Sequence, residues 1–86
     1  MTIIATINFR NGIIDNDSAH KVSSKKVASE ICDYLNIYDY TRQRNHRWNI
    51  VNLEDYGERK QKNILAIAER QGFIIRDGEL IEQKKW

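Results

Sequence analysis

The amino-acid sequence predicts one small α+β domain over residues 1–86, with an N-terminal β-hairpin, two or three helices and a C-terminal β-hairpin. Three observations lead to this fold class. Apolar residues alternate with polar ones near the N-terminus, as along a strand, and they recur at helical spacing in two later stretches. The dipeptides Asn-Gly and Asp-Gly stand where two hairpins would reverse direction. A chain of 86 residues has room for a single domain with a thin core.

The first predicted element is the stretch TIIATINF, in which the odd-numbered residues from Ile3 to Phe9 share one face of a strand. Asn11 and Gly12 tolerate the positive φ angles of a type I′ turn, so the chain is expected to return through the two isoleucines that follow. A two-residue loop places Phe9 opposite Ile14. The next stretch, NDSAHKVSS, is predicted to be a polar connection, because Asn, Asp and Ser favour turns.

A helix is expected over residues 24–37, capped by Ser23 or Ser24, because apolar residues recur there at intervals of three and four. The apolar stretch WNIV, residues 48–51, favours a short strand. The stretch NLEDYG then opens a short helix, with Asn52 as its cap and acidic residues in its first turn.

The clearest helix is predicted over residues 58–71, with isoleucine, leucine and alanine on its inner face and Gly72 at the C′ position beyond its end. A second hairpin over residues 73–82 follows, with an Asp-Gly turn that places Arg76 opposite Glu79. The sequence therefore predicts a helix that passes directly into a hairpin.

The charge distribution is more informative than the net charge of +2, which is too balanced to imply nucleic acid by itself. Two clusters of basic residues, each without an acid, lie within residues 41–63. The first contains Arg42, Arg44 and Arg47 and is followed by Trp48. Arginine can hold phosphates and tryptophan can stack on a base. A solvated loop with Trp48 buried, or a protein interface, is the alternative for the same residues.

The outward face of the helix predicted over residues 58–71 is the second candidate binding surface. At about 100° per residue, five residues point away from the core: Arg59, Lys62, Asn63, Ala66 and Arg70. Arg and Asn can pair with the edges of guanine and adenine, Lys neutralises phosphate, and a central Ala permits close approach. An ordinary solvated face and a contact with another protein are the alternatives.

The order of these elements resembles the winged helix-turn-helix superfamily. The matching parts are a helix, a strand, a short helix, a second helix and a wing, over residues 24–37, 48–51, 52–57, 58–71 and 73–82. The resemblance implies that the last helix enters the major groove of DNA and that the wing contacts the backbone. The N-terminal hairpin would be an addition to that pattern.

The sequence carries no pattern of a catalytic, metal or cofactor site. Cys32 is the only cysteine and is predicted to be a small core residue, while His20 and His46 lack the close spacing of metal ligands. The motifs of phosphate loops and nucleophilic enzymes are absent. Because no apolar run is long enough for a membrane span and no leader pattern follows Met1, we expect a cytoplasmic protein that is not an enzyme.

These observations favour a small nucleic-acid-binding or regulatory protein that uses a basic helix and a wing, with duplex DNA as the expected partner. The alternative is a phage or mobile-element type of small protein that binds and inhibits a host protein, such as a defence enzyme that acts on nucleic acid. A homodimer is compatible with both hypotheses.

Overall fold

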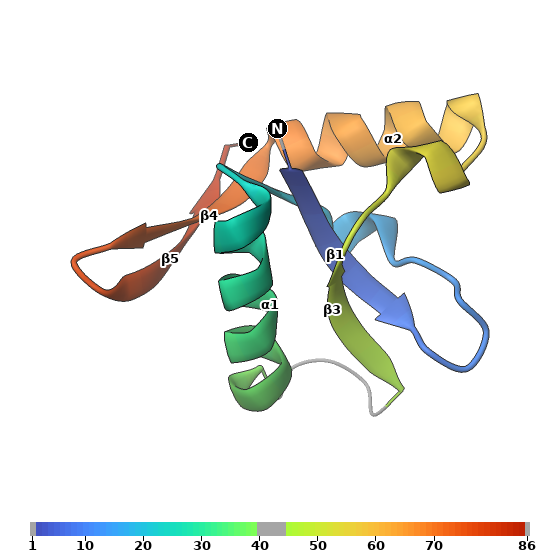
Figure 1. The fold of residues 1–86 in the computed structure, drawn as a ribbon. Helices are drawn as coiled ribbons and strands as arrows, with labels where there is room; N and C mark the ends of the chain where they lie inside the picture. The colour runs from blue at the N-terminus through green and yellow to red at the C-terminus, as the bar shows by residue number, and fades with distance from the viewer. Residues whose placement is uncertain (1, 40–44, 86) are drawn as a thin grey trace.

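A five-stranded mixed sheet with one long helix on each face forms the domain in the computed structural model, which describes residues 2–39 and 45–85 (Figure 1). In chain order the elements are β1 (Thr2–Asn8), η1 (Asn16–Ser18), β2 (His20–Val22), α1 (Lys25–Tyr38), β3 (His46–Ile50), η2 (Leu53–Asp55), α2 (Glu58–Glu69), β4 (Gln71–Arg76) and β5 (Glu79–Lys84). The strand order is β3-β1-β2-β4-β5, and only β2 and β4 pair in parallel. The predicted α+β class is confirmed.

β1 is an interior strand of the sheet, and its side chains are buried on both faces because one long helix covers each face. Ile3 and Ala5 pack on the side of α2, whereas Ile4, between them in sequence, packs on the side of α1. All three are at most 3% exposed. The predicted apolar face of odd-numbered residues is therefore present, and the even-numbered face is buried as well.

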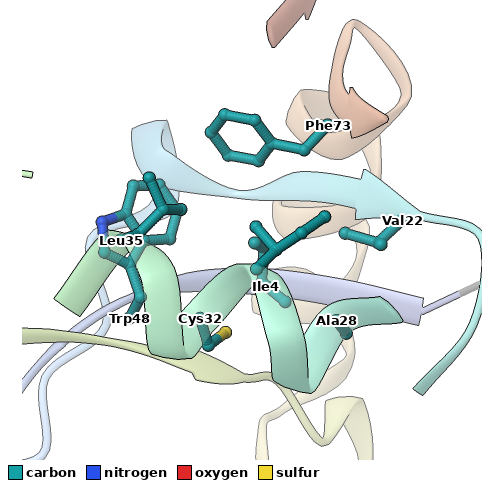
Figure 2. Close-up of a cluster of buried hydrophobic side chains, with 8 residues drawn as sticks. Ile4, Val22, Ala28, Cys32, Leu35, Trp48 and Phe73 are labelled. Carbon is teal, nitrogen blue, oxygen red and sulfur yellow. The ribbon is translucent and has the colours of Figure 1, made fainter. Parts of the chain in front are cut away.

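The core on the side of α1 contains the buried aromatic residues Trp48 and Phe73. Figure 2 shows its side chains between the helix and the sheet. Its buried residues are Ile4, Val22, Ala28, Ile31, Cys32, Leu35, Trp48 and Phe73. The helix predicted at 24–37 is confirmed, with Ser24 as the N-cap that accepts a hydrogen bond from the Val27 amide. Burial, together with the charge of Asp33, raises the pKa of Cys32 to about 11, so this thiol stays protonated as a core residue.

The core on the side of α2 contains Ile3, Ala5, Ile14, Ala19, Val51, Ile64 and Ala68. The helix predicted at 58–71 is confirmed, although it ends at Glu69. Gly72 does not occupy the C′ position that the sequence suggested, because Arg70 is the C-cap and β4 begins at once with Gln71.

The N-terminal hairpin is looser than predicted. Gly12 has the expected positive φ of 73°, but the bridge joins Ile7 to Ile14 and leaves Phe9 59% exposed in the loop. The Asn8 side chain accepts a hydrogen bond from the Arg10 amide, which favours a longer loop than two residues. The expected pairing of Phe9 with Ile14 is wrong, and the strands that pair with β1 along its length are β2 and β3.

The stretch read from sequence as a polar connection contains η1 and the interior strand β2. Ser18 is fully buried, and its hydroxyl accepts from the Thr6 amide at 2.7 Å while donating to the Asp15 carbonyl at 2.6 Å. Burial of these polar groups costs little because each of them has a hydrogen-bond partner. The local pattern could not reveal that, since Thr6 lies twelve residues away from Ser18.

His20, on β2, is 2% exposed and lies among aromatic rings. It stacks on Phe73 at 4.3 Å between ring centroids and meets the edge of Trp48 at 5.6 Å. Its Nδ1 lies 2.6 Å from the Ser18 carbonyl, which can only accept, so Nδ1 carries a hydrogen. Its Nε2 lies 2.9 Å from Oε1 of Glu82 on β5. The buried ring therefore links the Ser18 carbonyl to an exposed carboxyl group on β5.

A seam between β2 and β4 joins the N-terminal part of the sheet to the C-terminal hairpin. Its ladder pair is Lys21 with Gly72. A Cβ added to Gly72 would lie 2.9 Å from both Cγ and the carbonyl oxygen of Lys21, so glycine permits this close approach. Beside it, the side-chain amide of Gln71 donates through Nε2 to the carbonyls of Asp17 and Ala19 at 2.8 and 2.7 Å.

The C-terminal hairpin has the predicted register, in which Arg76 pairs with Glu79 across an Asp-Gly turn with φ angles of 53° and 78°. However, β4 is an interior strand that pairs with β2 as well as β5, and the two long helices lie on opposite faces of the sheet (Figure 1). The order of elements on which the resemblance to a winged helix rests is present, and the resemblance itself stays a prediction. No helix among the described residues is long and apolar enough to cross a membrane.

We predict that Gly72→Ala lowers the free energy of unfolding by about 1–3 kcal/mol, as overpacking does in other cores. The new methyl group would press on the Lys21 backbone, which cannot turn aside. Urea unfolding measures the loss. Gly57→Ser is the matched control, because no atom lies within 4 Å of that position, and its effect should stay within a few tenths of a kcal/mol. Equal stability of the Gly72→Ala protein and the wild type would show that the seam is not tightly packed.

The His20–Glu82 pair gives a second prediction, for the pH dependence of stability. Partial burial raises the pKa of Glu82, but the hydrogen bond and charge of His20, with Lys84, outweigh it and leave this pKa below its usual value. A carboxyl group with a lowered pKa stabilises the fold at neutral pH, and this contribution is lost as pH falls through the folded-state pKa.

We therefore expect Glu82→Gln to be less stable than the wild type at about pH 7, with a difference that shrinks toward about pH 3. Urea unfolding at both pH values measures it. A difference that stays constant between the two pH values would contradict the charge interaction with His20.

Candidate nucleic-acid interface

The orientation of α2 is fixed by two fully buried residues, Ile64 and Ala68, which pack against the sheet. At the start of the helix, Lys60 lies over the Tyr56 ring at 5.7 Å, and Gln61 donates to the Tyr56 carbonyl at 2.7 Å. These contacts at both ends hold the helix in one rotation about its axis, so the residues on the side opposite to Ile64 and Ala68 face away from the sheet.

The outward face of α2 is the one that the sequence predicts. Its residues Arg59, Lys62, Asn63, Ala66 and Arg70 are all exposed. Lys62 forms one ion pair, with Glu58 at 3.7 Å, and both side chains are at least 75% exposed. An exposed pair of this kind contributes only about 0.3–0.5 kcal/mol, so Lys62 can exchange this partner for a phosphate.

The C-terminal end of α2 adds a basic pocket of about 450 Å³. Four cationic residues line it, namely Lys21, Arg70, Lys84 and Lys85, with Glu69 as the acidic one. The Lys21 ammonium group donates to the Glu69 carbonyl at 3.5 Å, at the end of the helix where the carbonyl groups carry partial negative charge. The Lys85 amide donates to the Arg70 carbonyl at 2.6 Å, which fixes the end of β5 beside the helix.

Sequence reasoning missed Lys21, Lys84 and Lys85 as members of this surface. The predicted hairpin ended at residue 82, yet β5 runs through Lys84. Lys21 stood in the stretch that was expected to be a connection. The only local signal was the two adjacent lysines, whereas their closeness to Arg70 depends on the pairing of β5 with β4.

The structure places the first predicted basic cluster elsewhere. Trp48 is 5% exposed, packs in the α1 core and donates its indole N–H to Asp39 at 2.8 Å, so it is not a surface for base stacking. β3 is an edge strand of the sheet, and Arg47 is exposed at its start, at the end remote from η2 and α2 (Figure 1). Arg42 and Arg44 lie outside the described residues.

Trp48 was one of the candidate contact residues, and its burial corrects the expectation that its ring is open to a ligand. On β3, Trp48 alternates with Arg47 and Asn49, which are exposed, so the strand turns the tryptophan toward α1. The Asn36 side chain of that helix also donates to the Trp48 carbonyl and accepts from the Trp48 amide, at 3.0 and 2.7 Å. The helix thus covers both the ring and the backbone of this residue.

The chemistry that this surface offers is the binding of anions. Cations along α2 and around its C-terminal pocket can contact phosphates, and Asn63 can donate and accept hydrogen bonds. Within residues 2–39 and 45–85, no group of three or more His, Cys, Asp or Glu side chains is placed to hold a metal ion.

Comparison with known proteins returned no match, whether to protein-family models, to curated proteins or to solved structures.

Proposed function

We propose that the protein is a small nucleic-acid-binding or regulatory protein that contacts the phosphates of duplex DNA with the outward face of α2. The observation that carries this proposal is the set of exposed cations on that face, Arg59, Lys62 and Arg70, together with the pocket that Arg70 lines with Lys21 and Lys85. Cations gathered on one side of a molecule make more positive potential there than scattered charges do. Nucleic-acid backbones are the polyanions that such a surface binds in a salt-dependent way.

The composition of the face also fits a duplex. Ala66, at its centre, is small enough to allow the helix to approach a groove closely, and Asn63 can pair with an adenine edge. The acidic residues of α2 stand near its two ends, where Glu58 is paired with Lys62 and Glu69 borders the pocket. The middle of the outward face therefore presents Lys62 and the side-chain amide of Asn63 to a ligand.

A second candidate function is supported by a different observation. Tyr34, Ile37 and Tyr38 on α1 are all at least 50% exposed. Exposed apolar residues in one patch are typical of surfaces that bind proteins. A protein that inhibits a host enzyme, of the phage or mobile-element type that the sequence also suggested, would use such a patch.

The test of the proposed function is the affinity for a short fluorescent DNA duplex, measured by anisotropy at about 50 mM salt, where electrostatic contacts are favoured. We expect the wild type to bind, and the double variant Lys62→Glu with Arg70→Glu to lose binding. The salt dependence of any residual affinity should be shallower by about 0.9 per lost phosphate contact in a log–log plot. Thermal stability should change little, since both residues are exposed.

The matched control is Lys25→Glu with Lys26→Glu, which makes the same change in net charge at the exposed start of α1, on the other face of the sheet. This variant should keep most of the wild-type affinity. An equal loss in both double variants would show a general effect of net charge and contradict the assignment to α2. Absence of wild-type binding to both DNA and RNA would contradict the proposed function itself.

A further inference from the structure

A groove of about 470 Å³ lies between α1 and the C-terminal hairpin, on the face of the sheet opposite to α2. Its floor is the cross-strand pair of Ile75 and Leu80, and its wall includes Tyr34 and Ile31 of α1. The floor is open because α1 packs over β1, β2 and β3 and does not extend over the hairpin (Figure 1). Ile75 is consequently 46% exposed, although it faces the same side as the buried Phe73.

The charge of the groove is opposite to that of the rest of the molecule. The chain carries a net charge of +2, but the charged residues that line the groove are Glu30 and Glu79, both acidic and both exposed. Among the described residues, neither carboxylate forms an ion pair. The groove therefore combines an apolar floor with two carboxylates that a cationic ligand can neutralise.

Aromatic rings extend the groove along α1. The rings of Tyr34 and Tyr38 lie 4.7 Å apart between centroids, one helical turn from each other, and both residues are at least half exposed. The faces of tyrosine rings attract guanidinium and ammonium groups. Aliphatic stems of Arg or Lys also pack on apolar surface while their charged ends stay in water.

We propose that this groove binds a basic amphipathic segment of a partner protein. An aliphatic side chain of the segment packs on Ile75 and Leu80, and flanking arginines pair with Glu30 and Glu79 and lie over the tyrosine rings. The groove volume falls within the range of about 300–1,000 Å³ that is typical of ligand pockets. Because the sheet separates this groove from α2, the protein can hold nucleic acid on one face and a basic partner segment on the other.

The test uses a synthetic helical peptide with leucines on one side and arginines on its flanks, and a second peptide in which glutamate replaces every arginine. Titration into the ¹⁵N-labelled protein, followed by NMR, gives both the affinity and the place of binding. We expect the arginine peptide to shift the amide signals of Glu30, Tyr34 and residues 75–80, and the glutamate peptide to leave them unchanged.

Glu30→Gln with Glu79→Gln should weaken binding of the arginine peptide roughly two- to thirtyfold, as expected for the loss of two exposed ion pairs. The control Glu54→Gln with Asp55→Asn removes two exposed acids of η2 and should leave the affinity unchanged. Ile75→Ser should weaken binding without loss of the fold, since this side chain is half exposed. Equal weakening by both double variants would contradict the assignment to the groove.

Two other outcomes would overturn the proposal. One is absence of binding, or peptide-induced shifts confined to α2. The other is a dimer in sedimentation experiments that Glu30→Gln with Glu79→Gln dissociates, because the occupant of the groove would then be a second copy of the chain. Neither outcome depends on DNA binding, so the proposed function and the groove can fail separately.

Discussion

The close pairing of β2 with β4 is the constraint on which the rest of the structure depends. β2 has three residues, yet it connects the part of the sheet made by β1 and β3 with the hairpin of β4 and β5. Gly72 lets the two backbones approach. The Gln71 side chain of β4 binds the carbonyls of Asp17 and Ala19, just before β2, and His20 of β2 binds Glu82 of β5. A thin core of this size has little stability to lose, so these few contacts decide whether the hairpin stays with the domain.

Both candidate interfaces depend on that seam. It places the end of β5, with its lysines, beside the C-terminus of α2, and this closeness makes the basic pocket. It also holds the hairpin beside α1, where Ile75 and Leu80 become the floor of the acidic groove. The sheet keeps a cationic face and an acidic apolar face apart, so opposite charges on one small chain do not cancel each other.

Local chemistry made part of this fold predictable from sequence. The Asp-Gly turn decides the register of the C-terminal hairpin, and apolar spacing decides both long helices and the outward face of α2. β2 could not be predicted, because Ser18 and His20 are buried only through partners that are distant in sequence, such as Thr6 and Glu82. The burial of Trp48 was one of three interpretations of an aromatic residue beside arginines, and the packing of α1 on β3 shows that this residue is buried.

Native-state hydrogen exchange is the measurement that tests most directly whether the seam unites the two parts of the sheet. If it does, the hydrogen-bonded amides of β2, β4 and β1 should exchange with the same free energy of opening, equal to that of global unfolding. Their exchange should also respond equally to low concentrations of urea. Exchange of the β4–β5 hairpin at a clearly lower free energy, while β1 and β3 remain protected, would show that the hairpin opens by itself and would contradict the seam as the central constraint.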